Sequence, residues 1–200
     1  MTRARRWLVG GSALLILGLV GWVGLSRLRP PVFHGVVLQS PKPAADFTLT
    51  AHTGRRVHLS DFRGRLVLLF FGYTFCPDVC PVTLAKVAQA LKQLGPKAGQ
   101  VQVLFISVDP GRDTPERLAT YVTSFDPTFI GMTGTPEEIA VVAARYGISS
   151  KKEEGTKATG YLVAHTAIVT VIDPQGYVRL LFPFGLSPDK MADDLASLIR

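Results

Sequence analysis

The residues of this chain that could do metal or redox chemistry lie in one short stretch. Cys76 and Cys80 are the only cysteines among 200 residues, and they are four positions apart. Residues four apart on a helix share a face, with Cα atoms about 6 Å apart, and a disulfide tolerates that separation. The pair therefore predicts a disulfide, a reactive dithiol or two thiolate ligands for a soft metal.

The segments around the cysteines predict a strand followed by a helix. Residues 66–71 are six uncharged apolar residues between Gly64 and Gly72, which is typical of a strand buried on both faces. Apolar residues then recur at helical spacing from Val82 until Gly95. Because Pro77 suits a first helical turn, we expect Cys76 at the cap and Cys80 one turn inside. The helix dipole would then favour thiolates, at the strand end where open α/β sheets carry their chemistry.

The remaining pattern alternates strands with helices and ends in a hairpin and a helix. Residues 149–160 have no apolar periodicity, so we expect a mobile surface segment there. We predict a hairpin around Gly54 and an antiparallel hairpin through the turn at 173–176. The other predicted strands cover 101–108, 129–132, 167–172 and 177–182, and the other helices 114–125, 135–146 and 188–199. This order predicts a thioredoxin-like α/β fold, a mixed sheet flanked by helices.

The amino-terminal segment predicts a membrane anchor. Residues 7–25 carry no charge and lie between arginine clusters, and nineteen residues at about 1.5 Å each nearly match the hydrocarbon core. A cleaved signal peptide is the alternative, but no convincing cleavage site precedes Arg27. We therefore expect a cytoplasmic tail (1–6), a single transmembrane helix (7–25), a stiff proline-rich tether (26–45) and one extracytoplasmic domain (46–200).

The charge pattern argues against nucleic-acid binding. The formal net charge is +7, but the first 29 residues hold five arginines and no acid. The rest of the chain holds 17 basic and 15 acidic residues, an ordinary globular surface without a basic stripe.

Two thiolates make an incomplete metal site, so a third ligand is needed. The chain has four histidines. His34 falls in the tether, and His52 and His58 flank the first hairpin, where a solvated or capping role is expected. His165 directly precedes the strand at 167–172, whose start faces the cysteine loop in a thioredoxin-like fold. Two sulfurs and one imidazole suit Cu(I) and, with an added ligand, Cu(II).

A plain structural disulfide is the simplest competing interpretation. An extracytoplasmic location makes it credible. However, a bridge that closes so short a loop restricts the unfolded chain only weakly, which favours a chemical role for the pair.

Four motifs together resemble the Sco/SenC family, over roughly residues 45–200. They are FGYTFCPDVCP (71–81), SVDPGRDTPE (107–116), GTPEEI (134–139) and YLVAHT (161–166), in the order in which the family has them. Its members are membrane-anchored, thioredoxin-like copper proteins that assist assembly of cytochrome c oxidase, chiefly of its CuA centre.

The resemblance implies specific roles for residues of this chain. Cys76, Cys80 and His165 are expected to bind copper, as Cu(I) or Cu(II), and the two cysteines to form a redox-active disulfide. Asp78 matches the family pattern, either as a support for the site or only as a charge at the helix start. Ala164 departs from the acidic residue of many members, which puts Cu(II) affinity in question.

The resemblance also implies partners and a place in the cell. We expect a metallochaperone of the bacterial inner membrane, with its domain on the periplasmic side. Its partners would be the oxidase subunit that carries CuA, other copper chaperones and thioredoxin-like reductants.

Two enzymatic readings compete with copper delivery. A thiol–disulfide oxidoreductase that reduces the CuA cysteines, or another extracytoplasmic target, would use Cys76 and Cys80 alone. A thiol peroxidase would place a threonine three positions before its reactive cysteine, whereas Thr74 is two before Cys76. His165 distinguishes copper delivery from reduction, because disulfide exchange needs no imidazole.

Overall fold

The computed structural model describes residues 32–156 and 160–199. The expected cytoplasmic tail and transmembrane helix, and the first residues of the expected tether, lie outside this part of the chain. Among the described residues, no helix is long and apolar enough to cross a membrane.

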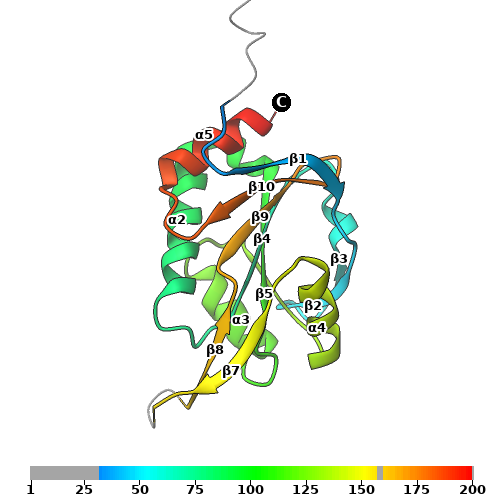
Figure 1. The fold of residues 1–200 in the computed structure, drawn as a ribbon, viewed down its shortest axis with the longest axis vertical. Coiled ribbons are helices and arrows are strands. Elements are labelled where there is room, and N and C mark those ends of the chain that lie inside the picture. The colour runs from blue at the N-terminus through cyan, green and yellow to red at the C-terminus, as the bar shows by residue number, and fades with distance from the viewer. Residues whose placement is uncertain (1–31, 157–159, 200) are drawn as a thin grey trace, which may run out of the picture. The chain divides into compact units, whose positions relative to one another are not determined.

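The fold is a mixed eight-stranded sheet with helices on both faces, as the sequence predicts (Figure 1). The strand order is β1-β10-β9-β4-β5-β6-β2-β3, in which β4, β5 and β6 run parallel and the other pairs antiparallel. Figure 1 shows α2 and α5 on one side of this sheet and α4 on the other. The strands are β1 (Val36–Pro43), β2 (Thr48–Ala51), β3 (Arg56–His58), β4 (Leu66–Gly72), β5 (Val101–Ser107), β6 (Ile130–Thr133), β9 (Ile168–Ile172) and β10 (Tyr177–Pro183).

The helices follow the capping signals of the sequence. In α3 (Pro115–Thr123) and α4 (Pro136–Arg145), proline occupies the first turn, and the hydroxyls of Thr114 and Thr135 accept the cap hydrogen bonds. The other helical elements are α2 (Val79–Leu94), α5 (Pro188–Leu198) and the short 3-10 turns η1 (Leu59–Phe62) and η2 (Gly95–Gln100).

The central strands form the core. All seven residues of β4 and all seven of β5 are buried, and the two strands pair in register from Leu66 and Val101 onward. Each is an apolar run because a sheet covered on both faces excludes water from both sides of every strand. This core fixes the carboxyl end of β4, where the cysteine loop begins.

The expected tether is partly wrong, because residues 36–43 form the edge strand β1 on β10. The register shifts between Val37 and Lys42, and Pro43 sits at the end of the strand. An edge strand tolerates proline because only one of its sides must donate hydrogen bonds. Prolines in this stretch therefore did not mark a free linker.

The segment at 149–160 also differs from the expectation. Residues Ser150–Glu154 form β7, which pairs antiparallel with β8 (Tyr161–His165) in a separate two-stranded sheet. All five residues of β7 are exposed. A strand with water on both faces needs no alternation of apolar and polar residues, so its sequence resembles a loop.

Candidate metal centre

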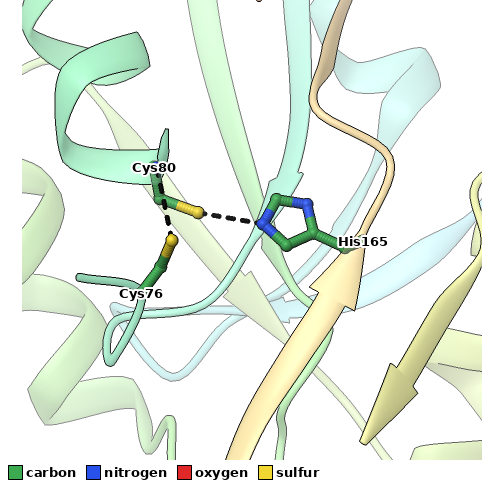
Figure 2. A group of neighbouring side chains, drawn as sticks. All are labelled: Cys76, Cys80 and His165. Carbon is green, nitrogen blue, oxygen red and sulfur yellow. Dashed lines mark hydrogen bonds between the residues drawn. The ribbon is translucent and has the colours of Figure 1, made fainter. Parts of the chain in front are cut away.

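Three elements bring Cys76, Cys80 and His165 together. Cys76 lies in the loop after β4, Cys80 is the second residue of α2, and His165 is the last residue of β8. Figure 2 shows that the two sulfur atoms and the imidazole point toward one another. The structure therefore places His165, which is far away in the sequence, beside the two cysteines.

The three side chains form a compact donor set. One ligand atom from each lies within 4.8 Å of the others, and this is the one such group of His, Cys, Asp or Glu found among the described residues. His165 Nε2 is 3.3 Å from Cys80 Sγ. His165 Nδ1 lies 3.3 Å from the carbonyl oxygen of Thr166, which can only accept. A proton on Nδ1 would leave the lone pair of Nε2 free to bind a metal ion.

The helix starts later than the sequence suggested. Helix α2 begins at Val79 with Asp78 as N-cap, so Cys76 and Pro77 precede it. A helix that began two residues earlier would need an N–H from Pro81 for its ladder, and proline has none. The Cys80 N–H instead donates to Cys76 Sγ at 3.5 Å. The first helical turn therefore points a backbone donor at a sulfur.

The two thiols have opposite acidities. A hydrogen bond from the Cys80 thiol lowers the pKa of Cys76 to about 3, and burial opposes this change. Hydrogen bonds from His165 and from the backbone of Asp78 and Cys80 lower it further. The same hydrogen bond, burial and the neighbouring thiolate raise the pKa of Cys80. At neutral pH, Cys76 is a thiolate and Cys80 holds the proton that the pair shares. Both cysteines are free in this structure.

The site is buried on one side and open on the other. Cys80 is fully buried, whereas Cys76 and His165 are partly exposed. The His165 ring packs edge-on against Tyr73 at 5.8 Å and against Phe70 at 6.3 Å. A Cβ on Gly72 would lie 2.7 Å from Cys80 Sγ, so only glycine admits the sulfur there. The Cys80 sulfur is thus packed inside the protein, whereas the Cys76 sulfur is accessible.

The other candidate residues lie away from the three ligands or play no ligand role. His52 Nδ1 accepts from the Gly131 N–H, and His58 Nδ1 is hydrogen-bonded to the Thr48 hydroxyl. His34 Nε2 is 4.0 Å from Asp193. Asp78 is exposed and makes no side-chain cap hydrogen bond, and the three-ligand group does not include it. Ala164 is exposed and pairs with Lys151 of β7.

Two buried acidic residues near the site are not singled out by the sequence. Asp109 and Asp113, in the loop after β5, are 1% and 0% exposed. Burial raises the pKa of Asp113, against the opposing effect of hydrogen bonds from Ser107 and Thr74. Both acids stand in the motif 107–116, but nothing in that sequence shows which segments they contact.

The chain belongs to the SCO1/SenC family, whose model matches residues 38–200. The bovine mitochondrial protein SCO2 homolog is 35% identical over 196 residues, which cover 92% of this chain and 74% of that protein. The human mitochondrial protein SCO1 homolog is 40% identical over 162 residues, which cover 80% of this chain and 54% of that protein.

Solved structures agree with this assignment. The copper-bound ScoI of Bradyrhizobium japonicum is 39% identical, with a TM-score of 0.72, over 78% of this chain and 99% of that one. The copper-bound ScoI of Arabidopsis thaliana is 34% identical, with a TM-score of 0.73, over 78% and 98%. Two sulfurs and an imidazole are soft and borderline donors, so the site of this chain suits copper.

Proposed function

We propose that this protein is a membrane-anchored copper chaperone that binds copper through Cys76, Cys80 and His165 and helps to metallate the CuA centre of cytochrome c oxidase. The observation that carries the proposal is the convergence of two sulfurs and one imidazole within 4.8 Å. The family assignment and the copper-bound relatives support copper as the cargo.

The openness of the site supports transfer rather than storage. Cys76 and His165 are partly exposed, so an acceptor can approach two of the three ligands directly. Three protein donors leave copper with room for a ligand from the acceptor, and exchange of ligands one at a time avoids free copper. We propose the oxidase subunit that carries CuA as the acceptor, with other copper chaperones and thioredoxin-like reductants upstream.

The proposed arrangement in the membrane follows from the sequence. Residues 7–25 would span the bacterial inner membrane, with 1–6 in the cytoplasm and the copper-binding domain in the periplasm. The charge-free run between arginine clusters supports it. A periplasmic reporter fused after Arg200 should be active, and activity of a cytoplasmic reporter alone would contradict this topology.

A thiol–disulfide reductase is the second candidate. The low pKa and partial exposure of Cys76 favour it, because an accessible thiolate attacks disulfides. The pair could serve both roles in turn, since reduction of the CuA cysteines must precede their metallation.

Substitution of His165 separates the two functions. His165→Ala should sharply weaken Cu(II) binding and block CuA loading in cells, but leave reduction of a model disulfide largely intact. His52→Ala is the matched control, because His52 accepts from the Gly131 N–H and does not belong to the three-ligand group, so it should change neither readout. A fully metallated oxidase in His165→Ala cells would refute the copper-donor proposal and leave the reductase.

A further inference from the structure

The position of His165 is not fixed by the main sheet. Strand β8 pairs with β7 in a sheet of its own, and among the described residues it has no ladder with β4 or β9. The cysteines, in contrast, follow directly from the central strand β4. Some other set of contacts must therefore hold the imidazole at bonding distance from the sulfurs.

One link joins the cysteine loop to β8 directly. The hydroxyl of Tyr73, three residues before Cys76, accepts a hydrogen bond from the Val163 N–H at 3.2 Å. Tyr73 is 2% exposed, and its ring also packs against the His165 ring. A single side chain thus contacts both the backbone and the imidazole of the histidine strand.

A second link joins the cysteine loop to the loop after β5. The Asp113 carboxylate accepts from the Thr74 N–H at 3.0 Å and from the Thr74 hydroxyl at 2.6 Å. The Ser107 hydroxyl donates to the same carboxylate at 2.6 Å and accepts from the Asp109 N–H at 3.0 Å. These bonds connect Thr74, two residues before Cys76, to the turn at 109–113.

A third link joins that same turn to the start of β8. The Tyr161 hydroxyl donates to Asp109 at 2.6 Å, and Arg112 Nε donates to the other oxygen of that carboxylate at 2.5 Å. The Arg112 guanidinium lies 3.6 Å from the centroid of the Tyr161 ring and 4.5 Å from that of Phe75. Arg112 therefore packs between the histidine strand and the cysteine loop.

We infer that the turn 109–113, which contributes no metal ligand, is the positioning element that sets the distance between the two cysteine sulfurs and His165. Together the three links form a closed triangle of cysteine loop, turn 109–113 and strand β8. Asp113 positions the sulfurs through Thr74, and Asp109 positions the imidazole through Tyr161. Buried carboxylates must keep their donors, so neither link can be exchanged for water at low cost.

Two hydroxyl deletions test the triangle without removing a buried charge. Thr74→Val removes the hydroxyl bond to Asp113 but leaves the backbone bond, so it weakens the link that positions the sulfurs. Tyr161→Phe removes the hydroxyl bond to Asp109 but keeps the ring against Arg112, so it weakens the link that positions the imidazole. Each should weaken Cu(II) binding by about 10-fold to 100-fold, the usual effect of losing a partner behind the ligands. Thr74→Val should change the thiolate-to-copper charge-transfer band, and Tyr161→Phe the nitrogen coupling in the electron paramagnetic resonance spectrum.

Metal-free protein gives an independent readout. Tyr161→Phe should shift and broaden the His165 ring signals in the NMR spectrum, and Thr74→Val should change the alkylation rate of Cys76. Asp194→Asn is the control, because Asp194 is 1% exposed and accepts from the N–H groups of His34 and Gly35. That substitution should lower the melting temperature but leave the copper affinity, both spectra and both metal-free signals unchanged.

The outcomes separate this inference from the proposed function on which it rests. Absence of copper binding by the unaltered protein would contradict the copper site itself. Wild-type affinity and spectra in both hydroxyl variants, or equal changes in Asp194→Asn, would contradict the positioning role alone.

Discussion

Strands β4 and β8 each lead to one side of the candidate copper site, but they are built differently. All seven residues of β4 are buried, and β4 pairs with β5 on one side and β9 on the other. Strand β8 pairs with β7, whose five residues are all exposed. The thiolates are therefore held by the core of the fold, whereas the imidazole is held by side-chain hydrogen bonds. One half of the site is thus held by the main sheet, and the other half depends on hydrogen bonds that involve Tyr73 and Tyr161.

The largest expected effect is on the two cysteines. Oxidation of Cys76 and Cys80 to a disulfide should abolish copper binding, because thiolates are the required ligands and only His165 would remain. Copper bound per domain, measured before and after oxidation and again after re-reduction, checks this. Reduced His165→Ala protein is the control, and we expect it to retain Cu(I). Undiminished copper uptake by the oxidised domain would show that the sulfurs are not the primary ligands.

Truncation of a side chain in the core should lower the free energy of unfolding far more than truncation of one in the exposed strand β7. Phe105 of β5 is fully buried and contacts the rings of Phe70 and Tyr121, so Phe105→Ala should lower the free energy of unfolding by about 3–5 kcal/mol. Lys151→Ala in the exposed strand β7 should change it by less than about 0.5 kcal/mol. Denaturant titrations of both variants give the values, and similar losses in the two would remove the contrast between the regions.

A smaller change should disturb the contact between strand and sulfur. In Gly72→Ala, the new methyl would meet Cys80 Sγ and Phe105 at 2.7 Å, so we expect about 1–3 kcal/mol of destabilisation from overpacking. The copper affinity should fall as well, because the sulfur must move. Gly99→Ala is the matched control, since its Cβ would have no neighbour within 4 Å. Equal unfolding free energies for the two variants would show that the structure around Cys80 accommodates the methyl group without destabilisation.

The smallest effect concerns the proton that the two cysteines share. Because the pKa of Cys76 is lowered to about 3, its alkylation rate should stay nearly constant from pH 8 down to pH 5. Removal of the Cys80 hydrogen bond in Cys80→Ala should raise that pKa, so that the rate at pH 5 drops by about tenfold or more. His52→Ala should keep the flat profile. A profile that already falls tenfold per pH unit in the unaltered protein would contradict the thiolate assignment.

The lowered pKa of Cys76 also makes the stability of the folded state depend on pH. A thiol whose pKa is lowered in the folded state stabilises that state fully only above the pKa of the unfolded thiol, about 8.5. That contribution decreases as the pH falls and is lost below about 3, where folded Cys76 becomes protonated.

The sequence by itself determined the fold class and the candidate ligands. Buried strands such as β4 and β5 show as uninterrupted apolar runs, because both of their faces exclude water. Thr114 and Thr135 marked helix starts, because a side-chain oxygen is needed to satisfy free N–H groups locally. Cys76, Cys80 and His165 could be selected as ligands from residue type, spacing and family motifs.

Only the tertiary structure decided the parts that depend on distant partners. The sequence predicts a tether and a loop where the structure has strands β1 and β7, because an exposed or edge strand is defined by its ladder rather than by apolar alternation. The start of α2 shifted because Pro81 cannot donate to a ladder that begins earlier. The roles of Asp109 and Asp113 also depend on partners that are distant in the sequence. A buried carboxylate is stable only where donors such as Thr74 and Tyr161 converge on it, and that convergence exists only in the folded chain.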